Sequence, residues 1–370
     1  MAVGVALAVA APAKILLCGK TPPRYPRRMK AVQLVANGSP GKFELRELPE
    51  PQPGADDVVV QVAACGLNRL DLWVEEAGLP IQIPLPRTQG GEVAGRVFAV
   101  GHNVSGWKSG DAVAVQSNIF CGECEYCQRG EESQCMRAEL LGVVRDGGFA
   151  EKVLVPQRAL MRLPAGLAFE TSAALSLAGS TAMHMLTSRA QVRAGDWVLI
   201  IGASSGVGSA AIQIAKHLGA RVISTGSSET KRALALRLGA DFAIDHSKPD
   251  WPAEVRKLTE RRGVDLVIEH VGGDVLPKCF ECLARGGTVV TCGATAGRDI
   301  SFNLWPFFVK QQRLVGSYGR NRVDLQTTLE WAAAGKLKPV IDSVFPLEQT
   351  ASAFAKLRAR DVLGKVLVKP

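Results

Sequence analysis

The sequence predicts an α/β protein in two parts, a β-rich domain and a domain built on a doubly wound parallel sheet. The chain has 370 residues, which exceeds the roughly 250–300 residues at which one hydrophobic core usually stops growing. Residues 29–155 consist of short β-branched runs broken by Gly and Pro. From about residue 160, strand-like and helix-like segments alternate, which is typical of a parallel sheet with crossover helices.

The β-rich domain is predicted from three strands and from the end of the chain. Residues 58–62, 92–97 and 112–115 are β-branched runs bounded by turn residues. Residues 364–368 are again strand-like, and the simplest expectation is that they rejoin this domain. We therefore expect residues 29–158 and 320–370 to form it, interrupted by a cysteine-bearing loop at 118–136.

The second domain is predicted over residues 159–319, where six apolar segments have the character of parallel strands. They lie at 198–201, 221–225, 242–244, 265–268, 288–291 and 314–315. Between the first two, apolar residues from Val207 to Leu218 recur at i, i+3 and i+4, the spacing of a helix packed on a sheet. Strands joined by such helices form a doubly wound sheet.

Composition excludes several classes of function. Apolar residues make up 47% and charged residues 21% of the chain, as in ordinary globular proteins. No run of 18 apolar residues predicts a membrane span. The net charge is +9, but residues 1–28 hold five basic residues and no acid, so the remainder carries +4 and does not predict nucleic-acid binding. Cysteines scattered outside one cluster favour a reducing compartment, and we expect a cytoplasmic protein.

Residues 1–28 are predicted to be an N-terminal extension. The apolar stretch from Met1 to Ala13 has no positive charge before it, unlike a secretory signal. Three interpretations stay open: a disordered extension, translation from a start codon upstream of Met29, and an Arg-bearing mitochondrial transit peptide. The last of these would make the protein mitochondrial.

Four closely spaced cysteines predict a metal site. Two CxxC steps share a residue, and a gap of seven residues precedes the last cysteine. Four thiolates this close can complete a tetrahedral shell around Zn²⁺, which leaves no open position for water or substrate. We therefore expect one structural zinc ion per subunit, bound by Cys121, Cys124, Cys127 and Cys135.

A glycine-rich turn between the first strand and the first helix of the second domain predicts a dinucleotide site. Glycines there let the backbone approach a pyrophosphate, which the N–H groups and the dipole of the helix N-terminus stabilise. The spacing differs from the common GxGxxG. The cofactor-binding residues predicted in this turn are Gly202, Ala203, Ser204, Ser205, Gly206, Val207 and Gly208.

The end of the second strand favours NADP(H) over NAD(H). A site for NAD places an acid about 20 residues after the glycines, where it binds the ribose 2′-hydroxyl. Here hydroxyls and cations follow instead, and these suit a 2′-phosphate. Glu229 is an exception, but acids are common in the first turn of a helix. The predicted contacts are Gly226, Ser227, Ser228 and Lys231, with Arg232 beside them.

With these features the chain resembles the medium-chain dehydrogenase/reductase superfamily of zinc-type alcohol dehydrogenases and quinone oxidoreductases. The resemblance runs from Met29 to Pro370 and rests on the cysteine segment, the turn at 203–208, GGEVAG at 90–95 and GKV at 364–366. It implies a GroES-like substrate-binding domain, a Rossmann domain and an active site in the cleft between them. It also implies homodimers or homotetramers, and cofactor contacts at Val271 and Gly293.

Departures from the family pattern indicate the chemistry. Where the family binds a catalytic zinc, Asn68 stands in place of Cys and Gly91 in place of His. The third ligand position falls at Leu177 or Ala178. A catalytic zinc needs three protein ligands and an open fourth position, so zinc-assisted alcohol oxidation is not expected. The resemblance instead implies hydride transfer from NADPH to a quinone or an activated alkene (an α,β-unsaturated carbonyl), where hydrogen-bond donors stabilise the substrate oxygen.

The expected catalytic residues are Asn68, Thr181 and Asp71. Asn68 is predicted to donate its amide to the substrate oxygen, unless it is only a turn former before a helix. Thr181 is expected at the nicotinamide ribose or ring face. Asp71 and Glu92 are expected to orient cleft residues such as Arg69.

Other residues and functions receive less support. The five histidines look isolated, and Tyr318 is expected in an ordinary loop although it could reach the cleft. Two other functions stay open. One is a zinc-type alcohol dehydrogenase acting on alcohols or aldehydes. The other is a non-catalytic NADPH-binding protein of the crystallin or RNA-binding kind.

Overall fold

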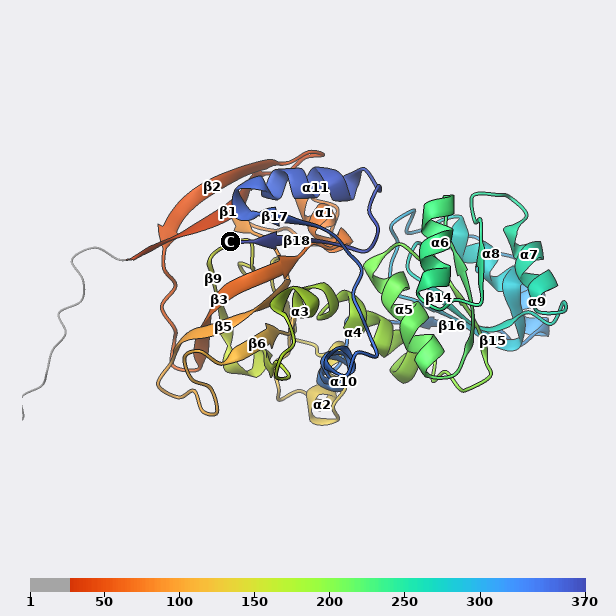
Figure 1. The fold of residues 1–370 in the computed structure, drawn as a ribbon, viewed down its shortest axis with the longest axis horizontal. Coiled ribbons are helices and arrows are strands. Elements are labelled where there is room, and N and C mark those ends of the chain that lie inside the picture. Colours follow the sequence, from red (N-terminus) through yellow and green to blue (C-terminus); the bar gives the residue numbers. More distant parts are fainter. Residues whose placement is uncertain (1–26) are drawn as a thin grey trace, which may run out of the picture.

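The computed structural model describes residues 27–370, which form two units side by side (Figure 1). One unit carries β-sheets built from the red to yellow part of the chain and its blue end. The other holds a single parallel sheet flanked by helices. This arrangement confirms the predicted α/β class. The expected N-terminal extension lies outside the described residues, except for Arg27 and Arg28.

The strands of the first unit form a large sheet and a small one. They are β1 (Arg28–Ala36), β2 (Lys42–Pro49), β3 (Asp57–Gly66), β4 (Arg87–Thr88), β5 (Glu92–Val100), β6 (Ala112–Val115), β9 (Lys152–Pro156), β10 (Leu160–Arg162), β17 (Ile341–Pro346) and β18 (Lys365–Lys369). The large sheet has the order β10-β6-β5-β3-β18-β17, with β9 paired to β3, and the small sheet has the order β2-β1-β4. The first strand begins at Arg28, one residue before the expected start of the β-rich domain at residue 29.

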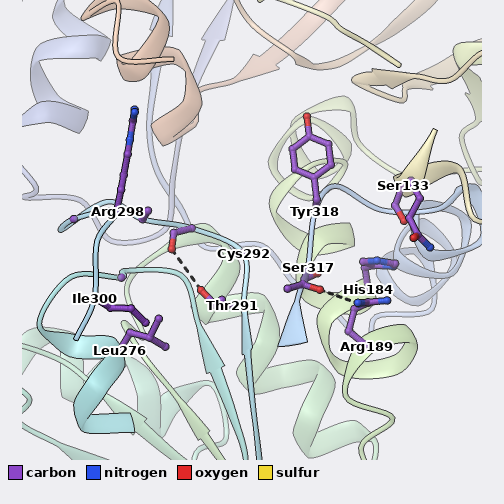
Figure 2. Close-up of a pocket in the computed structure, with 16 residues that line it drawn as sticks. Ser133, His184, Arg189, Leu276, Thr291, Cys292, Arg298, Ile300, Ser317 and Tyr318 are labelled. Atoms are coloured by element: carbon purple, nitrogen blue, oxygen red, sulfur yellow. Dashed lines mark hydrogen bonds between the residues drawn. The ribbon is translucent and has the colours of Figure 1, made fainter. Parts of the chain in front are cut away.

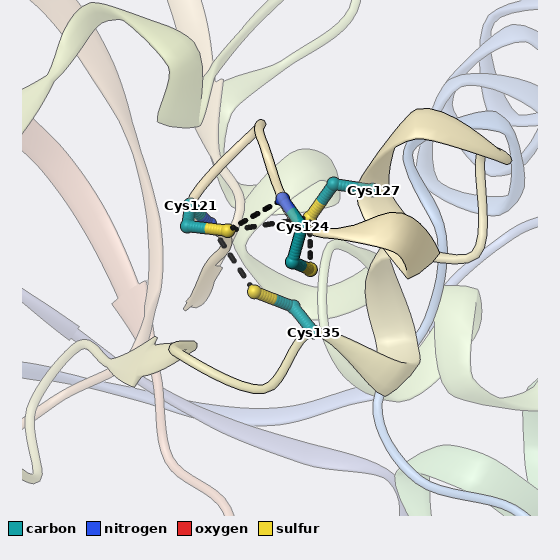
Figure 3. A group of neighbouring side chains, drawn as sticks. All are labelled: Cys121, Cys124, Cys127 and Cys135. Atoms are coloured by element: carbon teal, nitrogen blue, oxygen red, sulfur yellow. Dashed lines mark hydrogen bonds between the residues drawn. The ribbon is translucent and has the colours of Figure 1, made fainter.

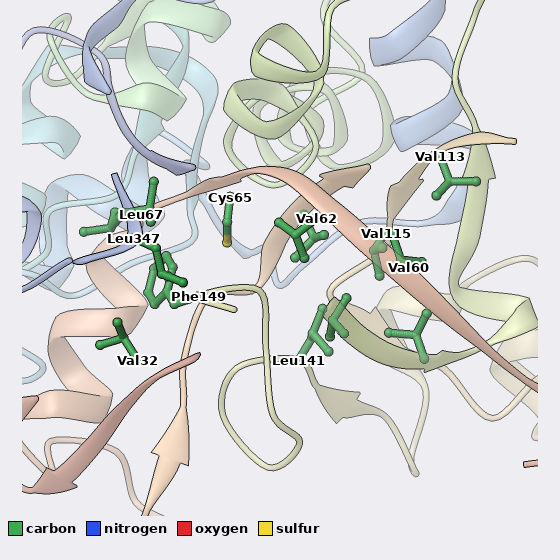
Figure 4. Close-up of a cluster of buried hydrophobic side chains, with 14 of the residues drawn as sticks. Val32, Val60, Val62, Cys65, Leu67, Val113, Val115, Leu141, Phe149 and Leu347 are labelled. Atoms are coloured by element: carbon green, nitrogen blue, oxygen red, sulfur yellow. The ribbon is translucent and has the colours of Figure 1, made fainter. Parts of the chain in front are cut away.

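Valines at alternate positions, on one face of these strands, build the core of the first unit. Val60 and Val62 of β3 pack with Val113 and Val115 of β6, and all four are buried (Figure 4). Helix α11 (Thr350–Arg358) closes one side of this core. Its Phe354 ring lies 4.6 Å from the Phe43 ring and 5.8 Å from the Phe149 ring, measured between centroids.

The end of the chain returns to the first unit, as its strand-like sequence suggested. Strand β18 pairs antiparallel with β3, with Leu367 opposite Gly66, and parallel with β17. This pairing brings Lys365, at the start of β18, beside the segment that leads from β3 into helix α1 (Arg69–Glu75). The position matters because that segment carries Asn68.

The second unit is a six-stranded sheet in which every neighbouring pair is parallel. Its strands are β11 (Trp197–Ile200), β12 (Arg221–Thr225), β13 (Phe242–Ile244), β14 (Val264–Glu269), β15 (Leu283–Thr291) and β16 (Arg313–Gly316), in the order β13-β12-β11-β14-β15-β16. The connecting helices are α5 (Gly206–His217), α6 (Glu229–Arg237), α7 (Trp251–Leu258), α8 (Val275–Cys282) and α9 (Leu304–Val309). Each predicted strand of this sheet is present, and the carboxyl ends of parallel strands share one edge, where ligands bind in such folds.

The connection between the units lies further along the chain than residue 158. Strand β10 pairs with β6 in the first sheet. Helix α3 (Phe169–Leu175) then packs its Ala173 and Ala174 against Ala64 and Ala94 of that sheet, where small side chains allow close approach. Helix α4 (Ala178–Met183) continues as a π-helical turn at His184–Arg189, and it packs against α5 and α10 (Arg322–Ala333).

The cysteine segment is more ordered than the loop that the sequence suggested. It contains a helical turn α2 (Glu125–Gln128) and a 3-10 turn at Glu132–Gln134. A short pair of strands, β7 (Asn118–Ile119) and β8 (Glu139–Leu140), joins its two ends.

Among the helices of residues 27–370, none has the length and apolar character needed to cross a membrane.

Candidate active site and metal centre

The four predicted cysteines converge on one point (Figure 3). Their sulfur atoms all lie within 4.8 Å of one another, and a tetrahedral Zn²⁺ with Zn–S bonds of roughly 2.3 Å needs sulfur atoms about 3.8 Å apart. Backbone N–H donors in the loop lower the pKa of the Cys121 thiol to about 6, which favours the thiolate that binds metal. The donor set and its geometry therefore fit a closed zinc site formed by Cys121, Cys124, Cys127 and Cys135.

The cysteine segment docks on the start of helix α10 through two hydrogen bonds. The Ser133 N–H donates to Asn321 Oδ1 at 2.9 Å, and the Arg322 N–H donates to Glu132 Oε2 at 3.2 Å. Cys135 directly follows the turn that carries Ser133. A metal held by Cys135 would thus fix the turn that contacts α10.

The glycine-rich turn has the shape that a pyrophosphate site requires. Gly202 has a φ of +75°, and a Cβ on Gly208 would lie 2.1 Å from the Gly202 carbonyl oxygen, so both positions need glycine. Ser205 caps helix α5 by accepting the Gly208 N–H at 2.8 Å. The residues predicted at 202–208 therefore lie together at the N-terminus of a twelve-residue helix.

Polar groups predicted to bind the cofactor 2′-phosphate gather after strand β12, but several have protein partners. Ser228 caps helix α6 and accepts the Lys231 N–H at 3.4 Å. The Lys231 ammonium donates to the Arg360 carbonyl at 3.2 Å. Arg232 pairs with Glu229 at 2.8 Å and with Asp245 at 3.0 Å. Arg232 is thus already neutralised, which leaves Lys231 as the cation without a carboxylate partner at this strand end.

Val271 and Gly293 follow β14 and β15, and a buried acid organises both strand ends. The Glu269 carboxylate accepts N–H groups from Val271 and Gly272 and, at 2.7 Å, the Thr291 hydroxyl. Gly293 lines the cavity described below. The predicted cofactor residues therefore come from four neighbouring strand ends of one sheet.

A buried ion pair lies beside positions at which the resemblance implies zinc ligands. Lys365 Nζ lies 2.6 Å from Glu92 Oε2, and their side chains are 5% and 0% exposed. The same ammonium donates to Asn68 Oδ1 at 2.7 Å and to the Leu67 carbonyl at 2.5 Å. The lysine stem also passes the cofactor turn, because a Cβ on Gly206 would lie 2.7 Å from Lys365 Cδ.

Asn68 is oriented by this cluster. Its oxygen must face Lys365, because an ammonium can only donate. Its Nδ2 then donates to Glu92 at 3.0 Å and to the Gly66 carbonyl at 3.3 Å. Both amide hydrogens therefore point to protein acceptors, so the predicted role of Asn68 as a donor to substrate would require these bonds to open.

Asp71 and Glu92 orient groups other than the expected Arg69. Asp71 accepts the Asn68 backbone N–H at 2.8 Å. Burial raises the pKa of the Asp71 carboxyl to about 6, and hydrogen bonding from Asn68 opposes this. Besides Asn68 and Lys365, Glu92 accepts the backbone N–H groups of Leu177 and Ala178 at 2.6 and 3.1 Å.

The residues at the three catalytic-zinc positions do not fit a metal. Asn68 is held by Lys365 and Glu92, and Leu177 contributes only its backbone N–H. A Cβ on Gly91 would lie 2.8 Å from the Leu141 carbonyl oxygen, so the backbone leaves little room for a side chain there. These three positions therefore do not supply the ligands of a second zinc.

A cavity of about 500 Å³ opens beside the carboxyl ends of β14, β15 and β16 (Figure 2). It combines residues of the second unit with two from the cysteine segment. Tyr318, in the loop after β16, is 60% exposed and lines the cavity, so the expected loop position and the reach toward the cleft that the sequence left open occur together. The polar lining residues are Ser133, Gln134, His184, Arg189, Thr291, Arg298, Ser317 and Tyr318.

His184 is not isolated, in contrast to the prediction. Its Nδ1 lies 2.7 Å from Asp324 Oδ2, and both side chains are buried. Asp324 also accepts the Ser188 hydroxyl at 3.0 Å and the Asn321 N–H at 2.8 Å. Asn321 is the residue that contacts the cysteine segment, so one chain of contacts leads from that segment to a histidine in the cavity wall.

His184 could not be recognised from the sequence because its partner lies 140 residues away. The predicted Thr181 lies on α4, one turn before His184, and is 8% exposed. His270 is likewise not isolated: it lies 3.1 Å from Ser205 Oγ, and burial lowers the pKa of its imidazole.

Comparison with known proteins agrees with this architecture. A model of the alcohol dehydrogenase GroES-like domain matches residues 54–165, and a model of the zinc-binding dehydrogenase family matches residues 206–334. Acryloyl-coenzyme A reductase of Sulfurisphaera tokodaii is 33% identical over 92% of this chain and 100% of its own length. A solved NAD-dependent alcohol dehydrogenase is 40% identical with a TM-score of 0.89, covering 92% of this chain and 100% of its own.

A further solved structure carries ligands. A 2-octenoyl-CoA carboxylase reductase in complex with NADP and 2-octenoyl-CoA is 29% identical with a TM-score of 0.84, over 93% of this chain and 88% of its own. The two matched domains, the parallel sheet and these relatives together establish the family. This chain belongs to the zinc-type medium-chain dehydrogenase/reductase superfamily and is an oxidoreductase.

Proposed function

We propose that this chain uses NADPH to reduce a carbon–carbon double bond conjugated to a carbonyl group, or a quinone, without a catalytic zinc. One observation carries the proposal. The three positions of the catalytic zinc ligands hold Asn68, Gly91 and Leu177, and the Lys365–Glu92 ion pair fills the region instead. A catalytic zinc with fewer than three protein ligands would lack its usual support.

A conjugated acceptor suits this site because its reaction needs no strong Lewis acid. Bound NADPH supplies the hydride, and hydride addition to the β-carbon moves negative charge onto the carbonyl oxygen. Preorganised hydrogen-bond donors can stabilise that charge. The glycine turn at 202–208 and the strand ends at Val271 and Gly293 are the residues that would hold the cofactor, and Gly293 also lines the cavity.

Two relatives support a thioester as the carbonyl group of the substrate. One is named an acryloyl-coenzyme A reductase, and another was solved with 2-octenoyl-CoA. Both ligands carry a double bond conjugated to a thioester. An open cavity of about 500 Å³ could admit the acyl end of such a molecule.

NADPH is the proposed cofactor because the end of β12 carries hydroxyls and Lys231 where NAD sites carry an acid. The solved relative with NADP is consistent with this choice. Glu229 and Asp245 are the nearest acids, and both pair with Arg232. Thr181 is proposed to contact the nicotinamide ribose from helix α4.

Alcohol oxidation with NAD is the second candidate, because a 40% identical relative is named an NAD-dependent alcohol dehydrogenase. The two candidates can be separated by initial rates with NADPH and NADH against crotonyl-CoA, 2-cyclohexenone, a benzoquinone and butanal, and by rates with NADP+ and NAD+ against butanol. We expect turnover of a conjugated alkene or quinone. Turnover of butanal and butanol alone would reject the proposal, and turnover of none would favour a non-catalytic role.

A further inference from the structure

Arg320 is a buried cation without a counter-ion. It follows Tyr318 and Gly319 after strand β16, and only 2% of its surface is exposed. Among residues 27–370, no carboxylate oxygen lies within 4.0 Å of a nitrogen of its guanidinium group. One guanidinium nitrogen donates to Ser117 Oγ, whereas its Nε is buried with no hydrogen-bond partner.

Such a side chain is unusual on energetic grounds. Arginine is almost never fully buried unless it is paired, and a buried donor without an acceptor is destabilising. Burial lowers the pKa of Arg320 to about 10, and the negative charge of Glu92 is the largest effect that raises it again. The guanidinium therefore stays charged at neutral pH. A fold that keeps this cation unpaired leaves it available to an acceptor from outside the chain.

Arg320 directly follows the wall of the cavity, and its hydrogen-bond partner lies beside the residue that precedes Glu92. Ser317 and Tyr318, just before it, line the cavity, and the Ser317 hydroxyl is also buried without a partner. Its hydrogen-bond partner Ser117 lies beside Gly91, because a Cβ on Gly91 would be 3.4 Å from Ser117 Cβ. The segment thus crosses from the parallel sheet to the first unit at the edge of the cavity.

We propose that Arg320 is a catalytic residue that binds the carbonyl oxygen of the conjugated substrate and stabilises the negative charge formed there. This inference rests on the proposed function. The hydride pair forms the new C–H bond at the β-carbon, and the π pair of the double bond shifts so that the carbonyl oxygen becomes an enolate oxygen. A proton from solvent then adds to the α-carbon, which gives the saturated carbonyl compound and the oxidised cofactor.

A guanidinium suits this task in the absence of a Lewis acid. Its planar donors keep their charge at all working pH values, and a charge-assisted hydrogen bond is about twice as strong as a neutral one. The bond strengthens as the carbonyl oxygen becomes an anion, so it favours the transition state over bound substrate. Arg320 would thus take over the electrostatic role that a metal has in zinc-containing relatives.

The test compares Arg320→Ala and Arg320→Lys with the parent enzyme on 2-cyclohexenone and crotonyl-CoA. We expect Arg320→Ala to lower kcat about 100-fold or more, the loss typical of one oxyanion donor. The KM for NADPH should stay within about twofold, because the hydrogen bond that Arg320 makes goes to Ser117 and not to a residue predicted to bind the cofactor. Guanidinium chloride at millimolar concentration should restore part of the rate of Arg320→Ala, and Arg320→Lys should lose less than Arg320→Ala.

A stability measurement separates catalysis from a structural role. Removing an unpaired buried cation should leave the thermal midpoint of Arg320→Met equal to or above that of the parent, although the rate falls. The control is Arg162→Met, whose guanidinium binds Asp111 and the Gly106 carbonyl on the surface. It should keep its rate and gain nothing from guanidinium.

The outcomes distinguish this inference from the proposed function. Should the parent reduce conjugated alkenes while Arg320→Ala retains its rate, the role of Arg320 is wrong and the proposed function stands. A loss of rate without guanidinium rescue, together with a lower midpoint for Arg320→Met, would also reject it in favour of a structural role. If the parent reduces no conjugated alkene or quinone, the proposed function fails first and this inference fails with it.

Discussion

At the scale of single residues, two buried cations interact with the Glu92 carboxylate. The Lys365 ammonium pairs with it directly, whereas its charge acts on the Arg320 guanidinium at longer range. Lys365 is fully engaged by Glu92 and Asn68. Removing the Glu92 carboxylate would leave the buried ammonium unpaired, which is strongly destabilising.

Lys231 tests the cofactor assignment at this scale. Its ammonium makes one hydrogen bond to a carbonyl and none to a carboxylate, so it is free to bind a 2′-phosphate. Loss of a charge-assisted hydrogen bond of about 1.5–3 kcal/mol predicts that Lys231→Ala weakens NADPH binding at least about tenfold. NADH binding should stay unchanged. Fluorescence titration measures both constants, with Lys257→Ala at the end of α7 as control, and an equal loss for both cofactors would contradict the assignment.

Asp71 gives a prediction for pH dependence. Its pKa of about 6 in the folded chain lies above the roughly 3.9 of an unfolded aspartate, so the folded state holds the proton to higher pH. The contribution of this group to stability is therefore full below about pH 4 and is lost as pH rises through about 6. The two pKa values bound that loss at about 3 kcal/mol.

The comparison needed is between the parent and Asp71→Asn, by urea unfolding at pH 4.5 and pH 7.5. The parent should lose free energy of unfolding relative to the variant as pH increases. If the difference between the two proteins is the same at both pH values, the raised pKa of Asp71 is wrong.

At the scale of elements, the cysteine segment also contacts the start of helix α10. Its 3-10 turn donates to Asn321, which caps helix α10, and Asp324 of that helix binds His184 in the cavity wall. The sequence identified the four cysteines and the metal they suit. It could not identify what the segment touches, because Ser133 and Asn321 are 188 residues apart.

This chain of contacts predicts that a change at α10 affects turnover while zinc is retained. Asn321→Ala removes the acceptor for Ser133, and helix caps of this kind are worth about 1 kcal/mol. We expect a several-fold lower kcat with one zinc per subunit still bound, measured by plasma emission. Cys135→Ser should lose both zinc and rate.

The matched control is Asn303→Ala, which removes the cap of α9, where Asn303 accepts the Trp305 N–H at 3.0 Å. It should cost similar stability and leave turnover unchanged. An unaltered rate in Asn321→Ala would show that the contact is structural only.

At the scale of the whole molecule, periodic patterns in the sequence predicted the strands and helices well. Contacts between segments without a periodic pattern were predicted poorly. Alternation of strands and helices after residue 160 predicted all six parallel strands, because each is a short apolar run with few competing structures. The domain limit at residue 158 was less exact, since β10 and α3 pack on the first sheet through small side chains that carry no periodic signal.

In the candidate site as well, local motifs were predicted from the sequence, whereas contacts between distant residues were not. The glycine turn and the cysteine cluster are local motifs, so the sequence predicted them and the structure brings each together. Arg320, Lys365 and the His184–Asp324 pair depend on residues 140 or more positions apart, and no local pattern marks them. Asn68 was predicted from the family pattern, but its amide is directed to Glu92 by a lysine near the end of the chain.

The position of the transferred hydride tests the central claim most directly. The enzyme would be supplied with NADPH deuterated at the transferable C4 position and with 2-cyclohexenone, and the product would be examined by deuterium NMR. The account predicts cyclohexanone with deuterium on the β-carbon. Deuterium on the carbinol carbon of 2-cyclohexenol would mean direct carbonyl reduction, and would contradict an alkene reductase without catalytic zinc.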